Sequence, residues 1–271
     1  YIAAPDINTA EQEMAVYVTA NGSLRSATGK PATLCVKPGE KCGIPHEYGS
    51  TGFGVAHATV VAVTHAKLGK GFTVAIEGFG NVGTFAAEHL EKLGARIVAV
   101  SDSKGCMHQK EGLDVKKLLS VKQTTGSVTN YTPGEKLPNE RLFTLPVDVL
   151  IPSALPYVIH EKNAAQVQAR VVVEAANIPV TEQAEQMLHK RGILVVPDFV
   201  ANAGGVISSY AEYRGLNPTD MFSLVEKKIV ANTRKVLTRA KKTHEAPRQA
   251  GLAIAVERVR HAMQKRYSKH A

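Results

Sequence analysis

The stretch Gly78-Phe79-Gly80-Asn81-Val82-Gly83 decides the fold of this 271-residue chain. It follows the β-branched run Thr73 to Ile76 and opens a helical pattern from Asn81 to Leu93. Its first glycine allows a tight turn, the second leaves no Cβ between the backbone and a pyrophosphate, and the third lets helix and strand approach closely. The helix N-terminus offers free N–H groups and a partial positive charge to phosphates. We therefore predict that these six residues bind a dinucleotide.

An acidic residue follows the next predicted strand. The run Ala95 to Val100 leads to Asp102, near the spacing of roughly 20 residues at which an acid meets the adenosine ribose hydroxyls. A carboxylate there favours NAD because it repels a 2′-phosphate, whereas Ser103 and Lys104 beside it could hold that phosphate. We predict that Asp102 and Ser103 contact the cofactor, which is NAD or NADP.

The rest of the centre alternates between short buried strands and helical patterns. Further strands are predicted at Val147 to Ile151, Val171 to Glu174 and Ile193 to Val196. This order predicts an α/β, doubly wound, Rossmann-like fold with a mostly parallel sheet and helices on both faces. From Ala203 to Arg266 long helical patterns, broken near Asn217-Pro218 and between His244 and Pro247, predict a C-terminal helical extension.

Composition limits the class of protein. Hydrophobic residues make up 44% and charged residues 21%, which excludes fibrous and disordered classes. The net charge of +9 would attract a polyanion, but no aromatic residues interleave with the densest basic group, from Lys227 to Lys242, and no recognition motif occurs, so we expect no nucleic-acid partner. No apolar run approaches the roughly 20 residues of a membrane helix, so we expect no membrane partner.

The segment Ser26 to Ser50 is rich in glycine and proline and is predicted to be a loop. It contains Cys35, Cys42 and His46, which could be three metal ligands, but their spacing matches no familiar zinc pattern and no fourth ligand is evident. We predict ordinary thiols and no metal. Three cysteines make no disulfide framework, so a reducing compartment and a cytoplasmic location are expected.

Five motifs together carry a family resemblance. They are Ala4-Pro5-Asp6-Ile7-Asn8-Thr9, Thr28-Gly29-Lys30-Pro31, Thr51-Gly52-Phe53-Gly54-Val55, the glycine-rich stretch, and Asn202-Ala203-Gly204-Gly205-Val206 with Ser209. In order and spacing they resemble the glutamate dehydrogenase family, whose wider group includes the leucine, phenylalanine and valine dehydrogenases. The resemblance covers nearly the whole chain but only part of the family's protein. It implies that the amino-terminal domain with the catalytic lysine and most oligomer contacts is absent.

The resemblance implies oxidative deamination of an L-amino acid, with hydride passing from Cα to C4 of the nicotinamide. Asp6 matches the family's catalytic aspartate, whose carboxylate can shuttle a proton to and from the substrate nitrogen. The alternative is that Asp6 caps a helix over Thr9 to Tyr17. Ser209 would line the side-chain pocket, and its polarity favours glutamate over branched or aromatic amino acids.

Further cofactor and substrate positions follow from the same resemblance. Thr51 matches the residue that contacts the nicotinamide amide, although a hydroxyl at Ser50-Thr51 could equally cap a helix. The Gly204-Gly205 pair would let a helix start close to the cofactor, or serve as a hinge. The remaining predicted positions are Asn177 beside the nicotinamide, Asn202 at both cofactor and substrate, Ser209 at the substrate, and Ser153 and Ala154 at a strand end against the cofactor.

One position departs from the family's pattern. Four residues before Thr51 the family has an arginine that helps to hold the substrate, and this chain has Glu47. A carboxylate cannot replace a guanidinium at an anionic substrate, so either the alignment shifts locally or the specificity is altered.

We predict three regions: residues 1–48 as remnant and linker of the catalytic domain, 49–216 as the NAD(P)-binding domain, and 217–271 as helices returning toward the catalytic domain. The function implied is NAD(P)-dependent oxidative deamination of glutamate by a full-length hexamer, with this fragment inactive alone. The alternatives are a non-catalytic NAD(P)-binding regulatory module and a related amino-acid dehydrogenase of different substrate preference. We also expect the helices after roughly Pro218 to expose an apolar face that the missing domain would cover.

Overall fold

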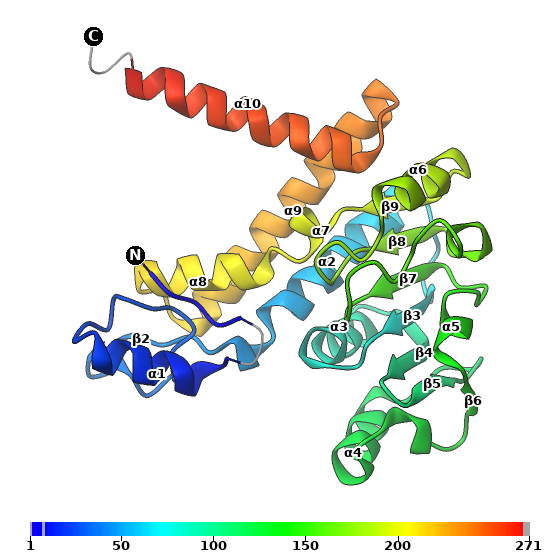
Figure 1. The fold of residues 1–271 in the computed structure, drawn as a ribbon, viewed down its shortest axis with the longest axis horizontal. Coiled ribbons are helices and arrows are strands. Elements are labelled where there is room, and N and C mark those ends of the chain that lie inside the picture. The colour runs from blue at the N-terminus through cyan, green and yellow to red at the C-terminus, as the bar shows by residue number, and fades with distance from the viewer. Residues whose placement is uncertain (1, 7–8, 268–271) are drawn as a thin grey trace.

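A computed structural model of the chain describes residues 2–6 and 9–267 (Figure 1). Positions 7 and 8 of the first motif therefore lie outside the described residues. Figure 1 shows the sheet with its covering helices on one side and the N-terminal segment beside α8 on the other. Its helices are α1 (Glu11–Ala20), α2 (Ser50–His65), α3 (Asn81–Lys92), α4 (Val115–Thr125), α5 (Asn139–Leu142), α6 (Glu182–Lys190), α7 (Asp198–Ala201), α8 (Gly204–Arg214), α9 (Pro218–Thr243) and α10 (Pro247–Tyr267), with 3-10 turns η1 (His46–Tyr48), η2 (Val128–Asn130) and η3 (Ala164–Gln166).

A seven-stranded sheet in the order β6-β5-β4-β3-β7-β8-β9 forms the centre of the fold. Its strands are β3 (Thr73–Glu77), β4 (Arg96–Asp102), β5 (Gly105–His108), β6 (Glu135–Leu137), β7 (Val149–Pro152), β8 (Val171–Val173) and β9 (Leu194–Val196). Strands β4, β3, β7, β8 and β9 are neighbours in this order and run parallel to one another. Strand β5 pairs antiparallel with β4, and β6 pairs antiparallel with β5. This arrangement confirms the predicted doubly wound, mostly parallel fold and all five predicted strands.

Alternate residues of the strands enter two separate cores, one on each face of the sheet. On β3, Val74 and Ile76 pack with α2, α3 and α9, whereas Ala75 between them packs with α5 and α6 on the opposite face. The strands are thus buried on both sides, which explains their continuous β-branched runs. Helices cover both faces, as predicted.

The strand order reverses at β3, which has β4 on one side and β7 on the other. The chain runs from β3 outward to β4 and then returns across β3 to β7. In doubly wound sheets such a switch leaves a crevice at the carboxyl ends of the strands, where ligands bind. The glycine-rich stretch lies directly after β3, at this crevice.

The segment between Ser26 and Ser50 is more ordered than a loop. It contains a hairpin of β1 (Cys35–Lys37) and β2 (Glu40–Cys42), and a disulfide joins Cys35 to Cys42. The prediction of ordinary thiols is wrong for these two cysteines, because antiparallel pairing places them opposite each other. Cys106, buried in β5, is the free cysteine.

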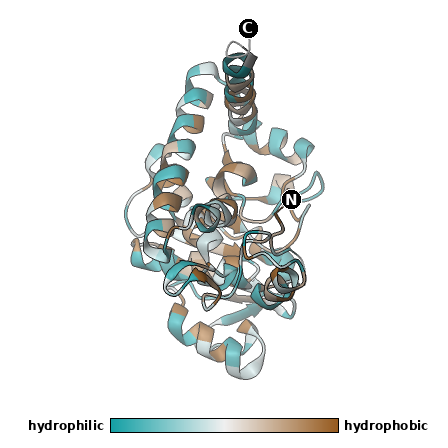
Figure 2. Ribbon diagram, turned by 90° about the vertical axis from the view of Figure 1, so that its left-hand side faces the viewer, coloured by the Kyte–Doolittle hydropathy of each residue, from teal (hydrophilic) through white to brown (hydrophobic). Residues whose placement is uncertain are grey.

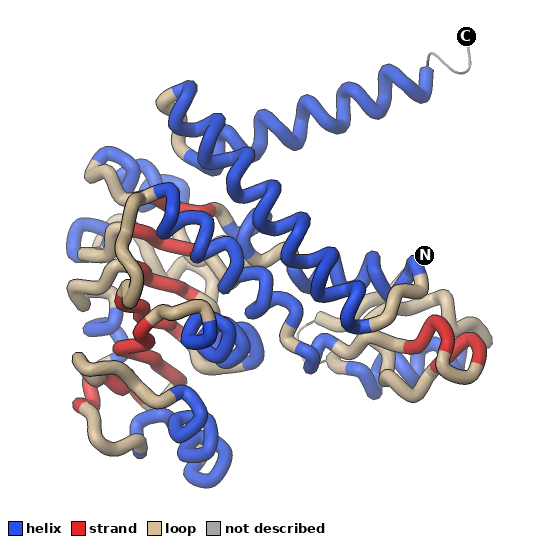
Figure 3. The backbone as a smooth tube through the Cα atoms, turned by 180° about the vertical axis from the view of Figure 1, so that it is seen from behind, coloured by secondary structure: helices blue, strands red, loops and turns tan. Residues whose placement is uncertain are grey.

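The C-terminal helices break where the sequence predicts, between residues 214 and 218 and between 243 and 247. Helix α9 packs on α2 and α8, whereas α10 projects away from the body (Figures 1 and 3). Apolar residues recur along exposed positions of α10 (Figure 2), namely Leu252, Val256, Val259 and Met263. An apolar face is thus exposed as expected, and its coverage by another domain stays a prediction. Within residues 2–6 and 9–267, no helix has the length and apolarity needed to cross a membrane.

Candidate functional site

The glycine-rich turn owes its shape to close contacts at Gly78 and Gly83. Gly78 has φ of +88°, and a Cβ on it would lie 2.4 Å from the Cβ of Ala154. A Cβ on Gly83 would lie 1.9 Å from the Gly78 carbonyl oxygen. Both distances are too short for any other residue, so the turn and the close approach of α3 to β3 require glycine here.

Gly80 differs from its two neighbours in the motif, because a Cβ on it would meet nothing within 4 Å. It is the N-cap of α3, and no side chain caps that end of the helix. The first N–H groups of a helix have no partners within it, and they carry a partial positive charge. The turn therefore presents uncapped backbone donors to open space, which suits an anionic group such as a pyrophosphate.

A cavity of about 750 Å³ lies over the carboxyl ends of β3, β4 and β7. Six residues predicted to contact a cofactor line it: Gly78, Phe79, Gly80, Asp102, Ser103 and Ala154. The structure thus brings together the glycine-rich turn and the acid after the following strand. A volume of this size lies within the usual range of ligand pockets, roughly 300 to 1,000 Å³.

The carboxylate of Asp102 already has partners within the chain. Its Oδ1 accepts hydrogen bonds from the Lys104 amide (2.8 Å) and the Ser127 hydroxyl (3.2 Å), and its Oδ2 accepts one from the Val128 amide (2.8 Å). Two carboxylate oxygens can accept about four hydrogen bonds, so capacity for a ribose hydroxyl remains. Asp102 therefore both lines the cavity and holds the neighbouring residues Lys104, Ser127 and Val128 in place.

Most of the other residues that line this cavity were not predicted from the sequence, among them Lys122 and Glu77. Lys122 of α4 donates from Nζ to the Phe79 carbonyl oxygen, with its ammonium 5.6 Å from the centre of the Phe79 ring. Glu77 ends β3, and its Oε2 accepts from the Ser153 and Ala154 amides, each at 3.1 Å. Burial raises the pKa of Glu77, against these amide hydrogen bonds. No local motif marks Lys122, because only tertiary folding brings α4 to the turn.

Ser153 holds the turn in place. Its hydroxyl lies 2.7 Å from the carbonyl oxygens of both Glu77 and Gly78, so the end of β7 is tied to the end of β3. The structure places Ser153 at the predicted strand end. Its contact with a cofactor stays a prediction.

Asn177 and Asn202 meet at a second place along the same sheet edge. Asn177 follows β8 and Asn202 ends α7, yet the Asn202 side-chain amide donates to the Asn177 side-chain oxygen at 2.8 Å. Both side chains retain exposed surface. Asn177, predicted beside the nicotinamide, and Asn202, predicted at both cofactor and substrate, are therefore neighbours in space.

The N-termini of α2 and α8 pack against each other beside this pair. A Cβ on Gly204 would lie 2.1 Å from the Ser50 carbonyl oxygen, and one on Gly205 would lie 2.8 Å from the Thr51 hydroxyl. The glycine pair thus serves close helix contact. Helix α2 has Gly49 as its N-cap without a side-chain hydrogen bond, so the reading of Ser50-Thr51 as a cap is wrong.

Asp6 and Ser209 lie on the two segments expected to border a substrate. The Asp6 amide donates to the Thr9 hydroxyl (2.7 Å), and α1 begins only at Glu11 with Ala10 as its N-cap, so Asp6 does not cap this helix. Ser209 is half-buried on α8. Glu47, at the position of the family's arginine, is exposed in η1.

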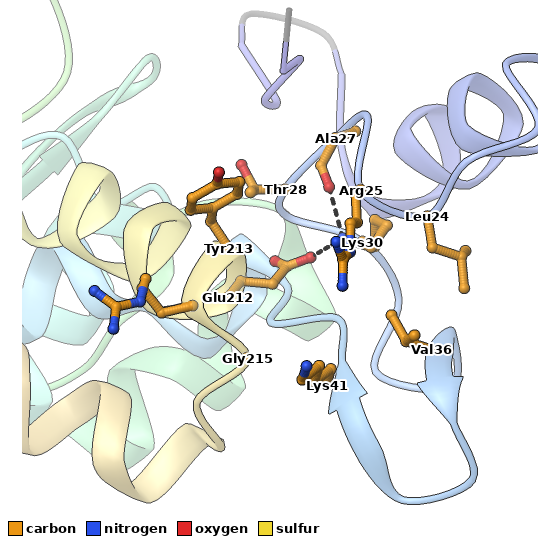
Figure 4. Close-up of a pocket in the computed structure, with 11 residues that line it drawn as sticks. Leu24, Arg25, Ala27, Thr28, Lys30, Val36, Lys41, Glu212, Tyr213 and Gly215 are labelled. Carbon is orange, nitrogen blue, oxygen red and sulfur yellow. Dashed lines mark hydrogen bonds and ion pairs between the residues drawn. The ribbon is translucent and has the colours of Figure 1, made fainter.

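The Thr28-Gly29-Lys30-Pro31 motif is tied to α8 through Glu212. Figure 4 shows Lys30 and Glu212 pointing toward one another beside a cavity of about 270 Å³, with the Ala27 carbonyl also accepting from Lys30. The other Glu212 oxygen accepts from the Gly29 amide (2.6 Å) and the Ile44 amide (3.0 Å). This buried junction fixes the N-terminal segment against α8.

The comparisons with known proteins agree with the resemblance seen in the sequence. A family model described as glutamate/leucine/phenylalanine/valine dehydrogenase matches residues 42–266. A glutamate dehydrogenase of Aeropyrum pernix is 40% identical over 98% of this chain and 66% of its own length, and an NADP-specific glutamate dehydrogenase of Saccharolobus shibatae is 41% identical over 98% and 64%.

Among solved structures, the hetero-hexameric glutamate dehydrogenase of Thermus thermophilus superposes with a TM-score of 0.85 at 32% identity, over 98% of this chain and 64% of that one. The chain thus spans just under two thirds of the length of the relatives it matches.

Proposed function

Because this chain belongs to the glutamate, leucine, phenylalanine and valine dehydrogenase family, we propose that it is the dinucleotide-binding part of an NAD(P)-dependent glutamate dehydrogenase. The observation that carries this proposal is the uncapped N-terminus of α3 at Gly80, which faces open space in the cavity over the carboxyl ends of the strands. A pyrophosphate fits such a set of backbone donors.

The residues that would hold the cofactor lie along one edge of the sheet. In the proposal the glycine-rich turn binds the pyrophosphate, Asp102 and Ser103 bind the adenosine ribose, and Thr51, Asn177 and Asn202 hold the nicotinamide. Ser153 and Ala154 support the turn from β7. When bound, oxidised NAD or NADP would supply the hydride acceptor for oxidation at the amino-acid Cα, a reaction that consumes water and releases 2-oxoglutarate, ammonium and a proton. Asp6 would move a proton to and from the substrate nitrogen.

Glutamate is the proposed substrate because Ser209 is polar and Asn202 lies on the adjoining segment. Glu47 is the observation that favours a second candidate, a related dehydrogenase with another amino acid as substrate, because a carboxylate there would repel an anionic side chain. A non-catalytic regulatory module is the third candidate. A substrate profile of a longer protein that includes the upstream domain, for the parent and for Ser209→Val, separates these candidates.

Several broader features belong to the same proposal. We retain the division at residues 48 and 216, a hexameric full-length protein and a cytoplasmic location. The Thermus thermophilus relative is described as hetero-hexameric, which supports the oligomer. The Cys35–Cys42 disulfide removes the cysteine argument for a reducing compartment. The 271-residue chain alone is expected to bind a dinucleotide and to turn over no amino acid.

Calorimetric titration of this chain with NADH and NADPH tests the proposal. Gly80→Val places a branched side chain in the open space before α3, so we expect binding to be lost while the fold is kept. Gly69→Val is the matched control, because a Cβ on Gly69 also meets nothing within 4 Å. Unchanged affinity in a folded Gly80→Val variant would contradict dinucleotide binding at the turn.

A further inference from the structure

One arginine on the C-terminal helix joins three buried carboxylates from three other elements. Arg248, in the first turn of α10, binds Glu185 of α6 through Nε at 2.5 Å and Asp198 of α7 through Nη1 at 3.0 Å. Its Nη2 binds Glu174, which follows β8, at 2.5 Å. The side chains of Glu174, Glu185 and Asp198 are 0%, 5% and 10% exposed. We call these four residues the arginine junction.

The arginine junction lies at the base of both segments that carry the asparagine pair. Glu174 is three residues before Asn177, and Asp198 is four residues before Asn202. The backbone N–H of Asn202 donates to the backbone carbonyl oxygen of Asp198 at 2.8 Å, and the backbone N–H of Asp198 donates to the Glu174 carboxylate at 2.8 Å. The two segments are therefore fixed to each other at the junction and meet again at the asparagine side chains.

A second contact links the arginine junction to Asn177 directly. The other carboxylate oxygen of Asp198 accepts from the amide of Ile178 at 2.9 Å. Ile178 has φ of +49°, a conformation that a β-branched residue adopts only when its surroundings hold it. Asp198 therefore holds the residue next to Asn177 in an unfavourable backbone conformation, and Arg248 holds Asp198.

Charge makes this arrangement depend on the arginine. Three buried carboxyl groups share one guanidinium, so removing the guanidinium takes away the cation and the hydrogen-bond donors that they share. The Arg248 guanidinium also packs 5.6 Å from the Phe199 ring, on the same short helix as Asp198. Without Arg248 the ends of β8 and α7 keep the hydrogen bonds between Asp198 and the Glu174–Ile178 segment but lose the shared cation, so we expect the asparagine side chains to be held less rigidly.

We propose that Arg248 is a positioning residue for the nicotinamide end of the cofactor, which it reaches only through Glu174, Asp198 and the Asn177–Asn202 pair. This inference rests on the proposed function, because it assigns a role within the same site. It adds a residue of the C-terminal extension to a site otherwise built from the strand ends.

Two ligands that differ only at the nicotinamide end test this role. NADH contains the nicotinamide nucleoside, whereas ADP-ribose carries the same adenosine and pyrophosphate without the nicotinamide ring. For Arg248→Met we expect about tenfold weaker NADH binding, equivalent to about 1.4 kcal/mol, and unchanged ADP-ribose binding. Asn177→Ala should show the same selective loss.

Arg239→Met is the matched control. Arg239 of α9 pairs with Glu257 of α10 at 2.6 Å, so it also anchors α10 but has no link to the asparagine pair. We expect this variant to bind both ligands as the parent does. An equal loss of NADH and ADP-ribose in Arg248→Met, or no loss of either, would overturn the positioning role.

Arg248→Lys covers the case in which Arg248→Met does not fold. Lysine keeps the positive charge but cannot bind three carboxylates in a fixed fork, so an intermediate and NADH-selective loss is expected. Parent-like NADH affinity in Arg248→Lys, with unshifted Asn177 and Asn202 side-chain amide signals in NMR spectra, would overturn the inference. If the parent chain binds neither ligand, the proposed function itself fails, which is a distinct result.

Discussion

The glycine-rich turn and the arginine junction lie at the same edge of one sheet but are stabilised in different ways. The turn depends on close steric contacts, since a Cβ at Gly83 would meet the Gly78 carbonyl at 1.9 Å and a Cβ at Gly78 would meet Ala154 at 2.4 Å. The arginine junction depends on ionisable side chains from the end of β8, from α6, α7 and α10, with Arg248 far along the chain from Glu174. The first is a steric constraint that pH does not change, and the second is electrostatic and titrates.

The largest effect on stability is expected from a substitution in the glycine-rich turn. Gly83→Ala forces a Cβ into the backbone of the turn, so we expect a loss of about 3 kcal/mol in unfolding free energy, measured by urea denaturation. Gly69→Ala serves as the control and should change stability by less than about 0.5 kcal/mol. Similar stabilities for the two variants would show that the turn relaxes around a Cβ.

The arginine junction should make the unfolding free energy depend on pH. Burial raises the pKa of Glu174 to about 8, with Glu185 and Asp198 acting in the same direction and Arg248 opposing them. The folded state then holds this proton more tightly than the unfolded chain, where the carboxyl has its ordinary pKa near 4.5. The stabilisation is therefore fully present below about pH 4.5 and is lost as pH rises through about 8.

Glu174→Gln replaces the titrating carboxyl with an amide, so the unfolding free energy should change less with pH between about 4.5 and about 8. We expect the parent's unfolding free energy to fall relative to the variant by up to about 1.4 kcal/mol per pH unit, measured by urea denaturation from about pH 5 to about pH 8. Glu182→Gln, an exposed acid on α6, is the control. Parallel profiles for parent and Glu174→Gln would argue against a retained proton.

Beside the glycine-rich turn, Asp102 adds a carboxylate that should select between the two dinucleotides. Asp102→Ala should weaken NADH binding about tenfold and NADPH binding by a smaller factor, since the carboxylate favours ribose hydroxyls and opposes a 2′-phosphate. Calorimetry with both dinucleotides measures the ratio. Ser127→Ala removes one internal hydrogen bond of Asp102, together with the Ser127 contacts to Thr129 that cap η2, but no group expected to face the cofactor, so it should leave the ratio unchanged. An equal loss of both dinucleotides in Asp102→Ala would remove it from cofactor selection.

Lys122 should give the smallest effect. Lys122→Met removes the Nζ hydrogen bond to the Phe79 carbonyl, and we expect a loss of about 1 kcal/mol in stability and about twofold in affinity for both dinucleotides. Lys116→Met, an exposed lysine on the same helix, is the control for the change in net charge. If both variants behave alike, the lysine acts only through general charge.

The two regions also differ in how far the sequence reveals them. The strands and the glycine-rich turn were predictable because their signals are local: a β-branched run, three glycines at fixed spacing, and an acid after the next strand. Strands β5 and β6 were missed because β5 is only four residues long and directly follows β4 across a tight turn, while the edge strand β6 carries exposed polar residues and shows no buried run.

Arg248, Glu77 and Lys122 were missed for a different reason. Arg248 and Lys122 reach the site through tertiary packing, so their neighbours in sequence give no signal. Glu77 directly precedes Gly78, but its contacts with the Ser153 and Ala154 amides are visible only in the fold. The disulfide was missed because the spacing of Cys35 and Cys42 does not show that a hairpin pairs them. Asn177 and Asn202 were found through family resemblance, whereas the network that holds them was visible only in three dimensions.

Cys106 makes the opening of the sheet measurable. It is fully buried in β5, and burial raises the pKa of its thiol to about 12. With the other two cysteines joined in a disulfide, a thiol-specific reagent has no reactive sulfur to attack in the folded chain. The rate of alkylation therefore reports how often strands β5 and β6 detach from the sheet, and its dependence on urea distinguishes that local event from unfolding of the whole chain.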